Sequence, residues 1–341
     1  MALAGKANGS GGGNKGVSVM KLCVFGAGAI GGNLAARFSA TAEVSVIARG
    51  EHLAAIQRDG ITVEAPDRTI NAKVKASADA RDLGPQDLVI VTVKAPALPD
   101  VAKGIGPLLK PDTPVLFVMN GIPWWYFHAH GGPLDGKRLP SIDPGDAVWT
   151  AVGPQRAIGG VIYSSNTVVR PGVVRNVSGR VHLIIGEPDG TLSERTAAIA
   201  RMVEASGATC KVSQCMRDDV WTKLLANLAS NPLTFLAQSS LGAIFSEPAC
   251  VEAVRTIARE AAAIAKALGC DVSLDIDKAF SGASQHKPSI VQDLERGRPL
   301  ELDATFVVPA ELGKLMKVPT PTLDLMVTLM KLRARGAGLY S

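Results

Sequence analysis

The fold is decided by the stretch KLCVFGAGAIGGNLAARFSA, residues 21–40. Its first part, Lys21–Phe25, is a short apolar run of the kind that forms a buried strand. Asn33–Ala40 is rich in alanine and predicts a helix. A glycine-rich turn joins the two. A strand, a turn and a helix in direct succession indicate the first βαβ unit of a parallel sheet.

The turn carries three glycines at the spacing Gly26-x-Gly28-x-x-Gly31. The first allows a tight turn, the second lets the backbone approach a pyrophosphate, and the third lets the helix pack closely on the strand. The N–H groups and the dipole of the helix N-terminus then favour an anion. Such a turn can be purely structural, but the strand and helix around it favour a dinucleotide site. The predicted cofactor contacts are Gly26, Ala27, Gly28, Ala29, Ile30 and Gly31.

Three further apolar runs, Val44–Ala48, Leu88–Val93 and Pro114–Met119, alternate with helical segments. Strands that are apolar throughout are typical of a parallel sheet covered by helices on both faces. We therefore predict an α/β Rossmann domain, a doubly wound parallel sheet, over residues 21–213.

The end of this domain, residues 158–190, has a different pattern. Val161–Val169 and Val173–Val177 predict strands, and they flank the turn signal Arg170-Pro171-Gly172. His182–Ile185 predicts another short strand. We expect a β-rich end to the first domain.

Helices replace strands after about residue 213. Apolar residues have helical spacing in Asp218–Ala237 and Cys250–Leu268. Pro232 predicts an interruption in the first of these helices, with Asn231 at a kink or end. We predict an all-α C-terminal domain over residues 214–336.

The overall composition limits the classes of function. The chain has 341 residues, of which 47% are apolar and 20% charged, as in a globular protein with a sizeable core. Its net charge of +5 is spread along the chain, which suits anionic ligands and gives no reason to predict nucleic-acid binding. The five scattered cysteines and five histidines contain no metal motif. We expect no metal site.

Residues 1–20 are rich in small and polar residues and predict a disordered leader. They lack the apolar segment of a signal peptide. No stretch of the sequence reaches the roughly 18 apolar residues of a membrane span. We expect a cytoplasmic protein that does not enter a membrane.

Polar residues follow the predicted strands where ligands of such sheets bind. Arg49 follows the second strand, where NAD sites usually place an acid, and an Arg there suits the 2′-phosphate of NADP(H). Lys94 and Asn120 follow the third and fourth strands. Each could be an ordinary loop residue, but their equivalent positions favour contacts with an NADP(H) cofactor.

A second group of polar residues lies on one predicted helix. Lys223, Asn227 and Asn231 are spaced i, i+4, i+8 and share one face, while the residues between them are mostly apolar. Buried polar groups need partners or cost several kcal/mol. A partly exposed helix face would also explain them, but two asparagines on one stripe favour a ligand cleft.

Together these residues resemble the ketopantoate reductase (2-dehydropantoate 2-reductase) family over nearly the whole chain, from Lys21 to about Arg335. The motifs that carry the resemblance are GAGAIG at Gly26–Gly31, VKA at Val93–Ala95, NG at Asn120-Gly121, WTKLLANLASNPLT at Trp221–Thr234 and PSIVQDLERGRPLELD at Pro288–Asp303. The resemblance implies reduction of 2-ketopantoate to pantoate with NADPH, a step of pantothenate biosynthesis.

The resemblance also implies roles for individual residues. Lys223 matches the general acid, and Glu301 matches an acid near the substrate hydroxyl and the nicotinamide ribose. Asn227, Asn231 and Ser289 match substrate contacts, Asn120 a residue that touches both substrate and cofactor, and Lys94 a cofactor contact. Leu241 departs from the family, because some members carry a polar substrate contact there.

Two other functions are considered. A D-2-hydroxyacid dehydrogenase of the same superfamily would act on another branched or aromatic 2-keto acid. A non-catalytic NADP(H)-binding regulator would not need Lys223 and Glu301 intact. The helices of the last third allow a homodimer, since they could pack on a partner chain as well as on the first domain.

Overall fold

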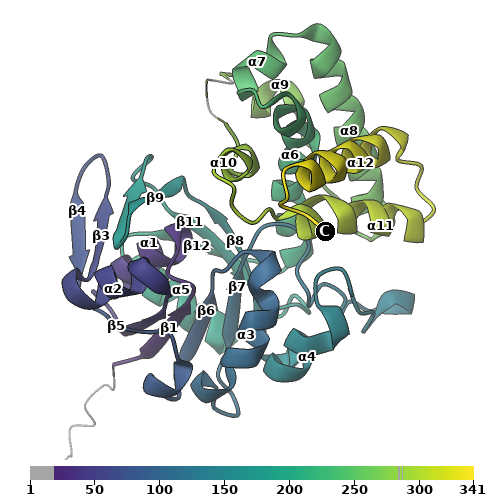
Figure 1. Cartoon of the computed structure of the whole chain (residues 1–341). Helices are drawn as coiled ribbons and strands as arrows, with labels where there is room; N and C mark the ends of the chain where they lie inside the picture. The colour runs from purple at the N-terminus through teal and green to yellow at the C-terminus, as the bar shows by residue number, and fades with distance from the viewer. Residues whose placement is uncertain (1–18, 283–284, 286) are drawn as a thin grey trace, which may run out of the picture.

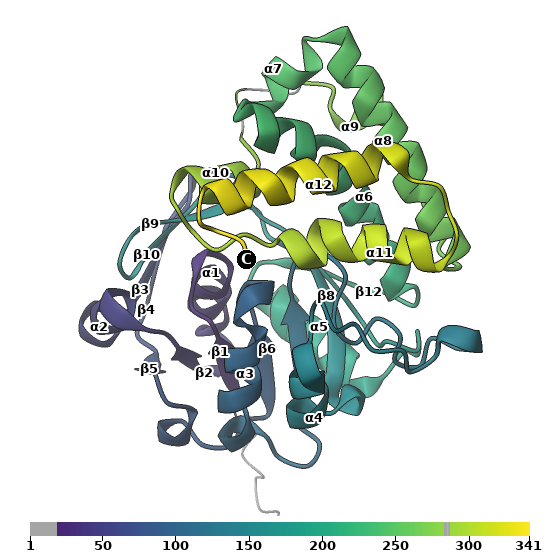
Figure 2. The same cartoon turned by 45° about the vertical axis from the view of Figure 1, so that its right-hand side comes forward.

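The computed structural model describes residues 19–282, 285 and 287–341. The predicted leader, residues 1–20, lies outside this range except for its last two residues. A strand-containing part comes first, and a helical part follows it and lies against the sheet edge at which the strands end (Figure 1). Figure 2 shows the same two parts from a second direction.

The main sheet has eight strands within the described residues, in the order β12-β11-β8-β7-β6-β1-β2-β5. Neighbouring strands run parallel, except β8 and β11. The strands are β1 Lys21–Phe25, β2 Glu43–Ile47, β5 Lys75–Ser77, β6 Leu88–Val91, β7 Val115–Val118, β8 Ala157–Tyr163, β11 His182–Gly186 and β12 Thr209–Val212. The predicted Rossmann-type sheet is confirmed.

The residues of β1 after Lys21 are all apolar and buried. Cys23 and Phe25 pack into one core, while Leu22 and Val24 pack into a second core on the opposite face. Successive side chains of a strand point to opposite faces, so both faces of the sheet are buried. The first of these cores continues into the helical part of the chain and includes Trp221 and Leu225.

A small second sheet covers the helix that follows β1. Its order is β4-β3-β10-β9, and its strands are β3 Ile61–Glu64, β4 Thr69–Ala72, β9 Asn166–Arg170 and β10 Val173–Asn176. Helix α1, Ala29–Phe38, contacts all four of these strands as well as β1 and β2. α1 therefore lies between the two sheets, and its first turn is fixed from both sides.

Two sequence expectations change in this part, and a third is confirmed. The helix begins at Ala29, inside the glycine-rich motif, and not at Asn33. The single strand expected at Val161–Val169 is split into β8 and β9, because the chain leaves the main sheet at Ser164 and joins the small one. The turn expected at Arg170-Pro171-Gly172 joins β9 to β10.

The remaining helices follow the chain in two groups. Those of the first part are α2 Gly50–Asp59, α3 Leu98–Gly104, α4 Ala147–Val152 and α5 Glu194–Ala205. Those of the helical part are α6 Met216–Ala237, α7 Leu241–Phe245, α8 Pro248–Ala267, α9 Ile276–Ala279, α10 Ser289–Glu295, α11 Val308–Leu315 and α12 Pro321–Gly336, with a π-helical turn at Asp303–Val307. Among the described residues, no helix combines the length and apolar character needed to cross a membrane.

The interruption expected at Pro232 is wrong. Helix α6 runs on to Ala237, so it does not end at Asn231. A proline removes one helical hydrogen bond. Pro232 is buried in the helical part, and the hydroxyl of Thr234 bonds to carbonyls of the preceding turn. Packing and these hydrogen bonds offset the helical hydrogen bond that Pro232 cannot make, and Asn231 stays on the helix.

Candidate active site

In the glycine-rich turn between β1 and α1, two of the three glycines are tightly enclosed and the third is open. A Cβ at Gly31 would lie 2.1 Å from the carbonyl oxygen of Gly26, so only glycine fits there. Gly26 has a φ of +103°, and a Cβ there would lie 2.6 Å from Cγ1 of Val93. At Gly28 a Cβ would meet no atom within 4 Å. The backbone at Gly28 is therefore accessible to a ligand.

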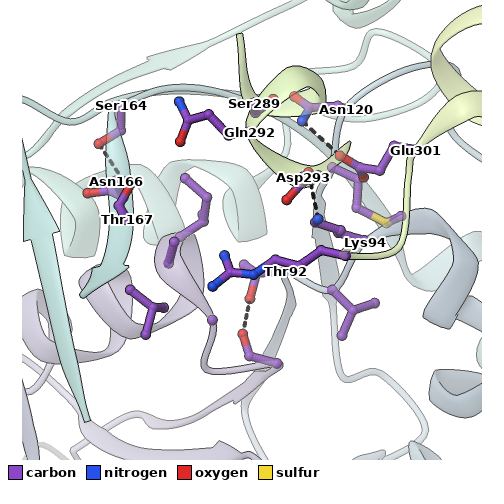
Figure 3. Close-up of a pocket in the computed structure, with 18 of the residues that line it drawn as sticks. Thr92, Lys94, Asn120, Ser164, Asn166, Thr167, Ser289, Gln292, Asp293 and Glu301 are labelled. Atoms are coloured by element: carbon purple, nitrogen blue, oxygen red, sulfur yellow. Dashed lines mark hydrogen bonds and ion pairs between the residues drawn. The ribbon is translucent and has the colours of Figure 1, made fainter. Parts of the chain in front are cut away.

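One cleft of about 1270 Å³ collects residues from both parts of the chain (Figure 3). All but one of the site residues predicted from the sequence line it. They are Gly26, Ala27, Gly28, Ala29, Ile30, Arg49, Lys94, Asn120, Lys223, Asn227, Asn231, Ser289 and Glu301. Gly31 lies beneath the turn. The cleft thus joins the glycine-rich turn to the polar stripe of α6.

Lys223 lies on α6 where the helix faces the end of β8. Its Nζ donates a hydrogen bond of 2.8 Å to the carbonyl oxygen of Ile162 and lies 5.8 Å from the ring centre of Tyr163. Burial lowers the pKa of Lys223 to about 8, against the opposing effect of Glu301. An amine with a pKa near neutrality can both hold and release a proton at physiological pH.

Glu301 follows α10 and enters the cleft from the helical part. Its Oε1 accepts a 3.3 Å bond from the N–H of Ala95, and its Oε2 accepts a 3.1 Å bond from Nδ2 of Asn120. Burial raises the pKa of Glu301, although these bonds and the charges of Lys94 and Lys223 act in the opposite direction. Figure 3 shows Asn120 and Glu301 side by side.

Lys94, which follows β6, reaches across to the helical part. Its Nζ lies 2.7 Å from Oδ2 of Asp293 on α10 and donates a 3.0 Å bond to the carbonyl oxygen of Pro299. Asp293 is largely buried, whereas Lys94 is partly exposed. Lys94 therefore links the two walls of the cleft.

Arg49 precedes α2 and lies at the opposite end of the cleft. Its guanidinium donates to Oδ2 of Asp100 on α3 at 3.0 Å, and both side chains are exposed. A guanidinium suits a phosphate, but the adjacent carboxylate would repel one. Asp100 therefore competes with a phosphate for Arg49, and the sequence pattern did not reveal this.

The amides of α6 face a small polar recess of about 20 Å³ that opens beside the main cleft. Asn227 and Asn231 line it together with Ser289, the first residue of α10. Thr305, on the π-helical turn, adds a hydroxyl. Amides and hydroxyls arranged in this way can hold a carboxylate or a hydroxyl group of a small ligand.

Two kinds of site residue are missing from the prediction made from the sequence. Asp293 lies four residues after Ser289 on α10, and this i, i+4 spacing is a signal that could have identified it. The wall from Ser164 to Pro171 carried no signal, because its side chains become cleft residues only when β9 leaves the main sheet.

Comparison with known proteins decides between the families that share this architecture. Residues 22–126 match the family described as ketopantoate reductase PanE/ApbA, and residues 215–334 match its C-terminal region. A 2-dehydropantoate 2-reductase of Mesorhizobium japonicum is 42% identical over 327 residues, which cover 94% of this chain and all of that protein. The chain belongs to the ketopantoate reductase family.

Solved structures agree with the family. A candidate ketopantoate reductase from Ralstonia solanacearum MolK2 has a TM-score of 0.89 and 38% identity, over 95% of this chain and all of that one. A D-mandelate dehydrogenase solved with NADH and anilino(oxo)acetate has a TM-score of 0.78 over 94% of this chain and all of that one. At 22% identity, that similarity shows a shared fold only. Ketopantoate reductases are oxidoreductases that use NADPH, and the open backbone at Gly28 fits such a dinucleotide.

Proposed function

We propose that this protein reduces 2-dehydropantoate to pantoate with NADPH. The observation that carries the proposal is the placement of Lys223 in one cleft with the glycine-rich turn, with a pKa lowered to about 8. The 42% identity to a 2-dehydropantoate 2-reductase supports the same substrate.

NADPH supplies a hydride to the keto carbon of the substrate. Negative charge then builds on the keto oxygen, and the ammonium of Lys223 stabilises it and gives it a proton. The hydrogen bond to Ile162 fixes the position of Nζ. The amides of Asn227 and Asn231 and the hydroxyl of Ser289 orient the carboxylate and the tail of the substrate.

Glu301 acts between substrate and cofactor in this proposal. Its carboxyl group is fixed by Asn120 and by the N–H of Ala95, so it stays at the centre of the cleft. Its negative charge also favours the ammonium form of Lys223. Gly26–Gly31 hold the pyrophosphate, and Arg49 and Lys94 supply positive charge to the phosphates.

A second substrate class is favoured by one specific observation. Leu241 and Phe280 line the same cleft as Lys223 and the amides, and Phe280 stacks on Phe245 with ring centres 4.5 Å apart. An apolar wall at this place suits a 2-keto acid with a branched or aromatic tail. Such a substrate would make the protein a D-2-hydroxyacid dehydrogenase of the same superfamily.

A panel of 2-keto acids decides between the two. NADPH oxidation is followed with 2-dehydropantoate, with 2-keto acids that have branched apolar tails and with an aromatic 2-keto acid. The largest kcat/KM is expected with 2-dehydropantoate. A preference for an apolar tail would favour the second class, and no oxidation with any member would favour a binding protein.

A homodimer and a cytoplasmic location complete the proposal. Leu325, Leu329 and Leu332 form an exposed apolar stripe on α12, with Leu325 and Leu332 more than half exposed. Exposed apolar stripes of this kind often pack on a partner. Sedimentation of the protein with and without Leu325→Lys tests the dimer, and fractionation of cells tests the location.

A further inference from the structure

His52, on the first turn of α2, makes two hydrogen bonds to backbone groups of different segments. Its Nε2 lies 2.6 Å from the carbonyl oxygen of Ala27, in the glycine-rich turn. Its Nδ1 lies 3.0 Å from the backbone N of Gly172, in the turn between β9 and β10. The side chain is half-buried and lines the cleft.

The chemistry of the two partners fixes the state of the ring. A backbone N–H can only donate, so Nδ1 accepts from Gly172. A carbonyl oxygen can only accept, so Nε2 carries a hydrogen and donates to Ala27. His52 is therefore neutral and protonated at Nε2. Neither nitrogen is left to react with a ligand, which points to a positioning residue and not to a catalytic one.

The bond to Ala27 determines where the next N–H of the turn points. The peptide group between Ala27 and Gly28 is planar and trans, so the C=O of Ala27 and the N–H of Gly28 point in opposite directions. By holding the carbonyl oxygen, His52 aims the N–H of Gly28 away from α2. Gly28 is also the residue whose backbone is open to a ligand.

The rest of the turn is fixed by other groups. The N–H groups of Gly26 and Ala27 both donate to the carbonyl oxygen of Ile47 at 3.1 Å. No backbone N–H donates to the oxygen of Ala27 within the described part of the chain. Without His52, the carbonyl oxygen of Ala27 keeps no hydrogen bond to a described backbone group, and the N–H of Gly28 is held in its direction less firmly.

The bond to Gly172 fixes the ring from the other side. Gly172 has a φ of +76°, and its carbonyl oxygen accepts from the N–H of Thr62 on β3. The small sheet thus supports His52, and His52 supports the glycine-rich turn. Figure 1 shows α2 beside α1 and the small sheet.

We propose that His52 is a positioning residue for the cofactor pyrophosphate, acting through the peptide group between Ala27 and Gly28. The proposal rests on the proposed use of NADP(H). Because NADPH and NADH share the pyrophosphate, loss of His52 weakens both by the same factor. This separates His52 from Arg49, whose proposed partner is the 2′-phosphate that NADH lacks.

The test compares three variants of the full-length protein by fluorescence titration with NADPH and with NADH. His52→Gln keeps a donor where Nε2 stands and loses the acceptor for Gly172, and His52→Asn does the reverse. His52→Ala loses both bonds. Gln57→Ala is the matched control, because Gln57 is also on α2 and bonds to a backbone oxygen, that of Ala76, away from the turn.

We expect a threefold to roughly tenfold rise in Kd for both cofactors in His52→Ala, the range expected for lost hydrogen bonds. His52→Gln should bind the cofactor more tightly than His52→Asn, and the control should match the wild type. With saturating NADPH, kcat and the KM of the keto acid should not change. A general folding defect would alter them as well.

An unchanged Kd in His52→Ala would overturn the role of His52, as would a loss confined to NADPH. If His52→Ala does not fold, the order of His52→Gln and His52→Asn decides, and equal affinities would overturn the proposal. A wild-type protein that binds neither cofactor would instead contradict the proposed function, so the two failures are distinguishable.

Discussion

Replacing Lys223 by methionine removes the ammonium while keeping most of the side-chain volume. General acid catalysis typically contributes a factor of roughly a hundred to ten thousand. We therefore expect kcat for keto-acid reduction to fall at least about a hundredfold. NADPH affinity should stay near that of the wild type, because Lys223 bonds to the carbonyl oxygen of Ile162 and not to the glycine-rich turn.

Stability should change much less than activity. The pKa of Lys223 falls from its usual 10.5 to about 8, so the buried ammonium destabilises the fold by roughly 3 kcal/mol. Losing its hydrogen bond to Ile162 costs about 1 to 3 kcal/mol. The two effects offset each other, and the free energy of unfolding should change by less than about 2 kcal/mol.

The stability and the kcat of the wild type should change with pH in opposite directions. In the wild type, the destabilisation by Lys223 is fully present below pH 8 and is relieved as the pH rises towards 10.5, because the unfolded chain binds the extra proton over that range. Reduction needs the protonated amine, so kcat should fall above about pH 8. Lys223→Met should lack both trends.

The assays are NADPH oxidation across pH and urea unfolding at pH 7 and pH 9. Lys211→Met is the matched control, since it removes a lysine that pairs with Asp219 and does not line the cleft. A folded Lys223→Met protein with near-normal turnover would refute the assignment of the proton donor.

The remaining predictions concern the two ends of the cleft. Arg49→Ala should raise the KM of NADPH far more than that of NADH, and equal rises would remove Arg49 from the 2′-phosphate. Asp100→Asn should lower the KM of NADPH a few-fold, because it frees Arg49 and removes a repelling charge; an increase would show that Asp100 holds Arg49 in place. Asn227→Ala and Asn231→Ala should each raise the KM of the keto acid roughly tenfold with little change in the Kd of NADPH by fluorescence; a large loss of NADPH affinity in both would place the stripe against the nucleotide.

The parts of the fold that could be predicted are those whose side chains are buried on both faces. β6 is apolar at every position, and β1 is apolar at every position after Lys21, because both strands pack into a core on each face of the main sheet. The short strands β4 and β12 were missed, because half or more of their residues are exposed or partly exposed and no apolar run marks them.

The candidate site could be predicted where a polar residue directly follows a predicted parallel strand. Lys94 and Asn120 lie in the cleft because they follow parallel strands that end at the same edge. Their pairings could not be predicted, since Asp293 and Glu301 are about two hundred residues away in sequence and meet Lys94 and Asn120 only when the helical part packs on the sheet.

The role of His52 could not be predicted either, although it is close in sequence to a predicted site residue. It is three residues from Arg49 and lies in a helix of ordinary sequence. Its partners, however, are backbone groups of two other segments, and backbone groups carry no residue-specific signal.

Direct hydride transfer from NADPH to the keto carbon of 2-dehydropantoate can be followed with an isotope. The most direct measurement uses NADPH with both hydrogens at C4 of the nicotinamide replaced by deuterium, and mass spectrometry of the product. We expect pantoate that carries one deuterium on C2, formed at the rate of NADPH oxidation. Pantoate without deuterium, or no pantoate while another 2-keto acid is reduced, would contradict it.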